Sequence, residues 1–191
     1  FVLPYTIQNY LADQITVPRF STELPEFAEA EKAVQARIDH LMGIKGKKSV
    51  DSIHKELGHI MWEYVGMGRT EEGLKTALKL LKDIRKEFET NLFIPGSTEG
   101  VNIELEKALR LNDFITMGEL IAYDALNRNE SCGGHFREEY QTEEGEAKRD
   151  DENYFYVSCW EYQGSDDVAP VLYKEPLVYE AIKVQTRNYK S

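Results

Sequence analysis

The chain has 191 residues, of which 41% are hydrophobic and 30% are charged, and its formal net charge is −11 at pH 7. A chain of this size can bury one sizeable core or two small ones, while its acidic balance argues against nucleic acid as a partner, because binding phosphates needs a basic face. No apolar run approaches the roughly 20 residues that cross a bilayer, and the two cysteines form no disulfide framework, which is typical of a reducing compartment.

Residues 1–15 predict an opening helix with a crowded apolar surface. Val2, Leu3, Ile7 and Leu11 all lie in this short segment. A domain rarely starts on an uncapped apolar stretch. We therefore expect the chain to be a fragment of a longer polypeptide, with a removed tag or a disordered leader as the alternative.

Three long helices are expected between residues 18 and 128. The first follows Pro25 and carries apolar residues three and four apart. Ser49 is a suitable N-cap for the second, and the GMGRT segment at 66–70 breaks or bends it, so the two pieces can form one long kinked helix. Asn102 caps the last and longest helix, whose apolar residues cover more than one face. The pattern predicts a mainly α fold built on an antiparallel, up-down-up three-helix bundle like a spectrin repeat.

The pattern changes in the third segment, residues 129–191. Residues 154–160, YFYVSCW, are rich in aromatic and β-branched side chains, which is typical of a strand. Residues 163–166 have turn composition, and 171–174 and 177–184 are candidates for further short strands. We expect a loop followed by a small β structure, in which 171–174 and 177–184 pair as a hairpin or form part of a three-stranded ribbon.

Few residues suggest chemistry of their own. Cys132 and His135 could bring a thiolate to an imidazole, as in a cysteine nucleophile or part of a zinc site, but no other ligands follow at motif spacing. The Gly133-Gly134 pair follows a helix and lacks the G-x-G-x-x-G pattern, so a close backbone crossing is a better interpretation than a phosphate cradle. Arg69, at the helix break, is either a plain surface residue or a contact for another surface.

A longer motif connects these residues to a known family. GGHFREEY followed by KRDDENY resembles the S-R-G-x-H-x-R-x-D … R-D-D-x-N-W signature of succinate dehydrogenase and fumarate reductase flavoprotein subunits. HKELGHIMWEYVGMGRTEEGL, at 54–74, is similar to the family's middle helix with its glycine–arginine break, and LVYEAIKVQTRNY, at 177–189, to its terminal strand. L-aspartate oxidases share part of the signature, but the aromatic-rich tail favours the respiratory enzymes.

The resemblance implies that the chain is the C-terminal helical domain and β tail of such a subunit, with residues 1–17 as the last helix of the FAD-binding domain. In the family, FAD and substrate are held by domains outside this sequence. No catalytic, cofactor-binding or metal-binding residue is therefore expected here. The implied partners are the chain's own FAD-binding domain, an iron–sulfur subunit and, indirectly, a membrane anchor subunit. The implied location is cytoplasmic, at the inner face of the cell membrane.

The positions that match the family signature are expected to form a structural and interface cluster. They are Arg69, Ser131, Gly134, His135, Arg137, Arg149, Asp150, Asp151 and Asn153. The sequence departs from the family where Cys132 replaces an arginine, where Tyr154 replaces a tryptophan, and where residues 141–147 lengthen the loop. A stand-alone acidic helical module that binds other proteins is the alternative function.

Overall fold

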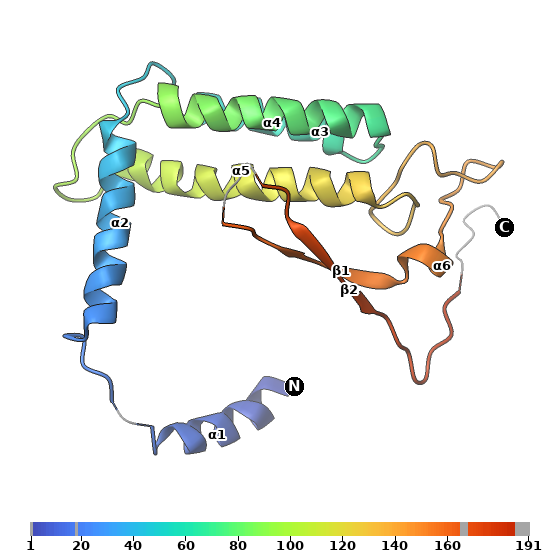
Figure 1. The fold of residues 1–191 in the computed structure, drawn as a ribbon, viewed down its shortest axis with the longest axis horizontal. Helices are drawn as coiled ribbons and strands as arrows, with labels where there is room; N and C mark the ends of the chain where they lie inside the picture. Colours follow the sequence, from blue (N-terminus) through green and yellow to red (C-terminus); the bar gives the residue numbers. More distant parts are fainter. Residues whose placement is uncertain (1, 18, 165–167, 186–191) are drawn as a thin grey trace. The chain divides into compact units, whose positions relative to one another are not determined.

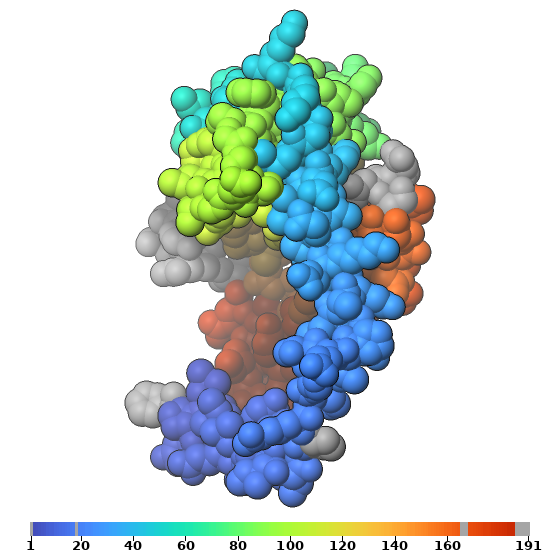
Figure 2. Space-filling view, turned by 90° about the vertical axis from the view of Figure 1, so that its left-hand side faces the viewer, coloured from blue at the N-terminus to red at the C-terminus, as the bar shows by residue number. Residues whose placement is uncertain are grey.

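The structure is a computed structural model that describes residues 2–17, 19–164 and 168–185 (Figure 1). The chain separates into two compact units, Phe1–Gly43 and Ile44–Ser191. The first contains α1 (Val2–Gln14) and α2 (Pro25–Gly43), so the opening helix and the helix start at Pro25 are confirmed. No residue of α1 is buried, and most residues of α2 are exposed. In the space-filling view, both helices are visible in blue at the surface (Figure 2).

The second unit is built on three helices: α3 (Val50–Val65), α4 (Glu71–Asn91) and α5 (Ile103–Asn127). Each begins at a side-chain cap, in which the oxygen of Ser49, Thr70 or Asn102 accepts a hydrogen bond from a first-turn backbone N–H. All three helices pack against one another. The predicted bundle is therefore present, but α3 and α4 supply two of its three helices, and α2 belongs to the first unit.

Of the two alternatives for the segment 66–70, the break is confirmed and the single kinked helix is wrong, because the segment separates α3 from α4 and reverses the chain. Gly66 ends α3, and a Cβ added there would lie 2.6 Å from the Trp62 carbonyl oxygen, so the reversal needs glycine. At the other end, Phe93 N–H donates to the Lys48 carbonyl over 2.8 Å, which brings the end of α4 to the start of α3. The two helices are thus antiparallel neighbours.

The up-down-up order is confirmed. Lys107, near the start of α5, pairs with Asp51, near the start of α3, over 3.1 Å, so α5 runs parallel to α3 and antiparallel to α4. The buried stripes of the three helices meet in one core, whose most enclosed side chains include Ile53, Leu74, Leu81, Leu111 and Ile115. Among the described residues, no helix combines the length and the hydropathy that a membrane span needs.

The last described part holds a short helix, α6 (Asp151–Tyr154), and two strands, β1 (Tyr156–Glu161) and β2 (Val171–Pro176). The strands pair antiparallel, from Tyr156 opposite Pro176 to Glu161 opposite Val171. A small hairpin is confirmed, but its strands are not the expected pair: 171–176 pairs with 156–161, and 177–185 contain no strand, so the three-stranded ribbon is wrong for the described residues. Part of the predicted 163–166 turn and of the terminal motif at 177–189 lies outside the described residues.

The hairpin docks on the end of α5. The Trp160 indole N–H donates to the Asp124 carboxylate over 2.8 Å, and the Trp160 ring meets the Tyr123 ring edge-on at 5.0 Å. A two-stranded hairpin is marginally stable alone. These contacts with α5 give the hairpin the support that it lacks by itself.

Candidate functional site

The candidate cluster begins at a tight turn after α5. Cys132 and His135 exchange two backbone hydrogen bonds, of 2.8 and 3.1 Å, and Gly133 between them has a φ of +59°. Cβ atoms added at Gly133 or Gly134 would meet no other atom within 4 Å. The predicted close backbone crossing is therefore wrong: the glycines serve a two-residue hairpin turn, for which a positive φ is needed at one position.

The His135 ring is held from two sides. Its Nδ1 lies 3.0 Å from Nη1 of Arg69, in the α3–α4 turn, and its Nε2 lies 2.8 Å from the backbone oxygen of Arg128, at the end of α5. A guanidinium only donates, so Nδ1 must accept and Nε2 must carry the proton. Burial, together with the charges of Arg69, Arg137 and Arg128, lowers the pKa of His135 below its ordinary 6.5, against the opposing effect of the Arg128 carbonyl.

This arrangement leaves His135 unable to act as a base for Cys132. Both ring nitrogens already have other partners, and the two residues meet through their backbones. Across residues 2–17, 19–164 and 168–185, no three histidine, cysteine or acidic side chains are grouped so that they could hold a metal ion. A thiol or metal site at this turn therefore has no geometric support.

Arg137 is the most enclosed charged residue of the cluster, with no exposed surface. Its Nη1 donates to the carbonyl oxygens of Ala125 and Leu126 over 3.1 and 3.4 Å, and its Nε donates to Glu139 over 3.1 Å. The carbonyls at the end of a helix lack partners within the helix and carry partial negative charge, so a buried guanidinium is a favourable cap for α5.

Ser131 and Glu139 connect Arg137 to its surroundings. The buried Ser131 hydroxyl accepts from Arg137 N–H over 2.8 Å and donates to the Arg137 carbonyl over 3.1 Å. Glu139 accepts from Glu71 N–H, at the start of α4, over 2.5 Å. Burial alone raises the pKa of Glu139, but the Glu71 N–H and the Arg137 guanidinium together bring that pKa below its ordinary value.

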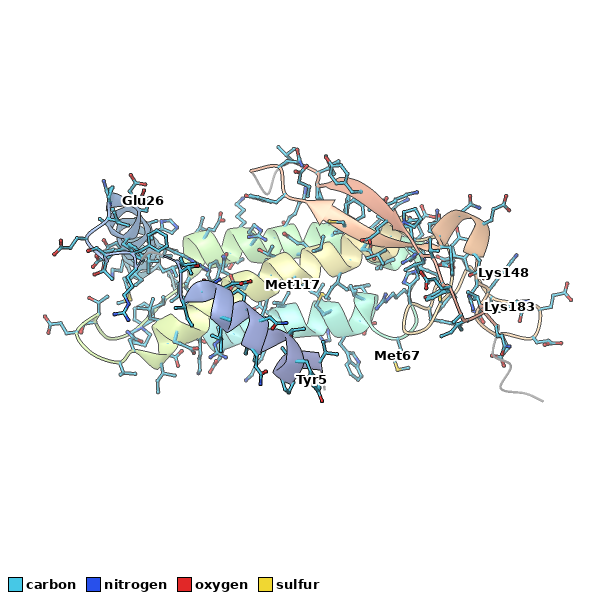
Figure 3. The ribbon with its side chains drawn as sticks, turned by 90° about the horizontal axis from the view of Figure 1, so that it is seen from below. Tyr5, Glu26, Met67, Met117, Lys148 and Lys183 are labelled. Carbon is cyan, nitrogen blue, oxygen red and sulfur yellow. The ribbon has the colours of Figure 1, made fainter. Side chains whose placement is uncertain are left out.

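Arg69 adds a backbone link between the same elements. Its N–H donates to the Phe136 carbonyl over 3.0 Å, and its carbonyl accepts from Glu138 N–H over 2.8 Å. Its Nε donates to the carbonyls of Val65 and Gly66, at the end of α3, over 3.2 and 3.1 Å. The loop after α5 is thus bonded to the α3–α4 turn through both backbone and side chain. Met67, in the same turn, is 91% exposed and points away from the bundle (Figure 3).

The other four charged or polar residues of the cluster lie in or next to α6, away from this network. They are Arg149, Asp150, Asp151 and Asn153. The Asp150 carboxylate caps α6 and also accepts from the Asn153 side chain over 2.9 Å. Arg149 donates to Asp151 over 2.6 Å and to the Gln185 carbonyl over 3.1 Å, and the bond with Asp151 raises the pKa of Arg149. The residues of the expected cluster therefore lie in two groups. One is buried around Arg137, and the other is half-exposed around Asp150.

Two residues that the sequence did not single out join these groups. Arg128 donates to the carbonyls of Tyr154 and Tyr156, the second over 3.1 Å, and pairs with Glu130 over 3.1 Å. Glu130, only 3% exposed, accepts from Asp150 N–H over 2.9 Å. In the sequence, Arg128 and Glu130 stand out only as charged residues next to the end of α5. Nothing in the neighbouring sequence indicates that Glu130 would be buried.

The fold and the cluster define a small helical domain whose polar residues bond its own turn, helix end and hairpin to one another. Residues 54–189 match the model of the fumarate reductase flavoprotein C-terminal family. The chain belongs to this family.

Two relatives and one solved structure illustrate the similarity. The chain is 29% identical over 171 residues to the fumarate reductase flavoprotein subunit of Helicobacter pylori, covering 90% of this chain and 23% of that protein. It is 37% identical over 88 residues to an L-aspartate oxidase of Nicotiana tabacum, covering 46% of this chain and 13% of that protein. A quinol fumarate reductase of E. coli has the same fold, with a TM-score of 0.68 and 21% identity over 90% of this chain and 28% of that one. The chain thus spans less than a third of the length of each of these proteins.

Proposed function

We propose that the chain is the non-catalytic C-terminal part of a flavoprotein that interconverts fumarate and succinate, where it supports the FAD-binding domain and offers surface to an iron–sulfur subunit. The observation that carries the proposal is the similarity to the Helicobacter pylori fumarate reductase flavoprotein subunit, which extends over 90% of this chain but only 23% of that protein. A region of this kind within a larger enzyme is expected to act through contacts with the rest of it.

Exposed apolar side chains on α1 and α5 support a role in binding other domains or subunits. In α1, Val2, Leu3 and Tyr5 are 73–79% exposed. On α5, Phe114, Met117 and Ile121 follow one face, three and four residues apart, and are 42–52% exposed. Contiguous exposed apolar residues mark surfaces that other protein covers. Each of the two helices therefore presents a face suited to another domain.

The described residues do not fit FAD themselves. The diphosphate of a dinucleotide is usually held by a glycine-rich turn that leads from a strand into a helix. In the described part of the chain, every helix precedes both strands, so no such turn is present. A pocket of about 300 Å³ between α4, α5 and the hairpin is lined mainly by apolar side chains, among them Leu78, Leu120 and Trp160. We assign FAD to the rest of the parent protein and derive no chemical step from this chain.

The partners follow from the same proposal. In the parent protein, FAD would exchange electrons with the iron–sulfur subunit, and a membrane anchor subunit would hold the complex at the inner face of the cell membrane. The structural relatives include quinol fumarate reductases, and this similarity supports a membrane-associated assembly. The chain's own contribution would be its outer surfaces, including the exposed faces of α1 and α5.

The test compares the chain produced alone with the chain produced together with the polypeptide encoded before Phe1. Alone, it should show no flavin absorbance and no succinate-dependent dye reduction; joined to the preceding polypeptide, it should show both. A flavin bound stoichiometrically by this chain alone would contradict the proposal. A start codon directly before Phe1, with no strand and G-x-G-x-x-G motif upstream, would favour the stand-alone protein-interaction module instead.

A surface variant tests the supporting role directly. Met117→Asp places a charge in the exposed α5 face and should leave folding intact, since the side chain is 52% exposed. It should weaken association with the FAD-binding part by about tenfold or more if Met117 lies within the interface. Ile103→Asp is the matched control, because Ile103 is 64% exposed at the far end of the same helix. Equal affinity of the Met117 variant and the unchanged chain would remove this face from the proposal.

A further inference from the structure

We propose that His135 is an acid-sensitive latch that bonds the loop after α5 to the α3–α4 turn when neutral and releases it when protonated. The latch consists of three groups: the His135 ring, the Arg69 guanidinium and the Arg128 carbonyl. Arg69 and His135 are 66 residues apart in the sequence, so the ring joins its own loop to a distant turn, while Arg128 lies only 7 residues before His135. This device is independent of the redox role proposed for the parent protein.

The geometry admits only one protonation state. Nδ1 of His135 faces an Arg69 N–H at 3.0 Å, and Nε2 faces the Arg128 carbonyl at 2.8 Å. Neutral imidazole with its proton on Nε2 satisfies both contacts, by accepting from Arg69 and donating to Arg128. A proton added to Nδ1 would place an N–H against an N–H, so protonation removes the Arg69 bond and leaves two donors opposed.

The charges around the ring also disfavour its protonation. A permanent cation faces the ring from each surrounding element: Arg69 from the α3–α4 turn, Arg128 from the end of α5, and Arg137 from the ring's own segment. Each arginine also has an acidic neighbour: Asp124 acts on Arg69, Glu130 pairs with Arg128, and Glu139 pairs with Arg137. The ring's own hydrogen bonds go to Arg69 and to the Arg128 carbonyl. An imidazolium would therefore meet three like charges without gaining a carboxylate partner.

The direction of the pH effect follows from linkage. Because the pKa of His135 in the folded chain lies below the ordinary 6.5, an open or unfolded form takes up the proton first as pH falls. The latch is fully closed above pH 6.5, and its contribution is lost as pH falls through the lower pKa of the folded form. The bonds that flank the latch, Arg69 N–H to Phe136 and Glu138 N–H to Arg69, should open with it.

The experiment is NMR of the 191-residue chain at about pH 7.5 and about pH 5, on either side of ordinary histidine titration. Imidazole nitrogen shifts should show the Nε2–H tautomer at the higher pH. The hydrogen-exchange protection factors of the Arg69 and Glu138 amides should fall about tenfold or more at the lower pH, as expected when a hydrogen bond to a charged group is lost. The Phe93 amide, bonded to Lys48 at the opposite end of the bundle, should keep its protection.

Two variants complete the test. His135→Gln keeps a side chain that accepts and donates but does not titrate, so its protection at Arg69 and Glu138 should no longer depend on pH. His59→Gln is the matched control, since His59 is exposed on α3, and it should behave like the unchanged chain. An Nδ1–H tautomer, unchanged protection at the lower pH, or the same loss in His135→Gln would each overturn the latch. If His135→Gln does not fold, the tautomer and protection of the unchanged chain decide the question.

Discussion

Replacement of Arg137 by methionine should destabilise the second unit by about 3 kcal/mol. The change removes the donors that reach the Ala125 and Leu126 carbonyls and Glu139, over 3.1–3.4 Å. A hydrogen bond to a charged group contributes roughly 1.5–3 kcal/mol, and a buried acceptor left without its partner costs about 1–3 kcal/mol. The loss comes mainly from the two α5 carbonyls, because the Glu139 side chain is 39% exposed and can recover water. Methionine fills a similar unbranched volume, so the loss reports the polar contacts rather than a cavity.

Urea unfolding followed by tryptophan fluorescence measures this effect selectively. The chain has two tryptophans, Trp62 and Trp160, and both lie in the second unit. The midpoint should fall while the slope stays constant, which identifies a change in stability rather than in compactness. Arg110→Met is the matched control: Arg110 pairs with Glu106 at the surface, with 70% of its side chain exposed, and its loss should cost less than about 0.5 kcal/mol. A loss below about 1 kcal/mol for Arg137→Met would refute the view that this guanidinium caps α5.

Three further experiments test the core, two glycines and the acid response. Leu81→Ala should cost about 2–5 kcal/mol in urea unfolding, because Leu81 has no exposed surface, whereas Val101→Ala, at a site 97% exposed, should change stability by less than about 0.5 kcal/mol. Gly58→Ala should stabilise α3 by roughly 0.5–1 kcal/mol, since an added Cβ meets no atom within 4 Å, while Gly46→Ala should destabilise, since its Cβ would lie 2.0 Å from backbone atoms at the end of α4. Glu139→Gln should flatten the loss of melting temperature below about pH 4.5, because the lowered pKa of Glu139 makes its contribution present above that pH and lost as pH falls. An unchanged acid profile in Glu139→Gln would show that this carboxylate is not linked to folding.

The helices of the second unit were predictable because their signals are local. The caps at Ser49 and Asn102 and the apolar periodicity each involve residues within one or two turns of each other. The strand at β1 was predictable from its aromatic and β-branched composition. The direction of the chain after α3 was not, since a glycine-containing segment between two amphipathic stretches is compatible with a kink as well as with a reversal.

The candidate cluster shows the same division. The sequence motif identified Arg69, Ser131, His135 and Arg137, and the structure brings these four together. It places Arg149, Asp150, Asp151 and Asn153 in a second group around α6. Whether a charged residue is buried depends on which helices and loops pack over it. For that reason, the full burial of Arg137 and the link from Glu139 to α4 could not be predicted.

By itself, the sequence determined the type and the caps of the helices, the small β hairpin and the resemblance to one flavoprotein family, since these depend on neighbours along the chain. Only the tertiary structure decided the antiparallel pairing of α3 with α4, the tautomer of His135 and the capping of α5 by Arg137. Those features join groups that lie far apart in the sequence, such as Arg69 and His135, 66 residues apart. A hydrogen bond over such a separation exists only once the core has packed, and the packed core then fixes which donor meets which acceptor.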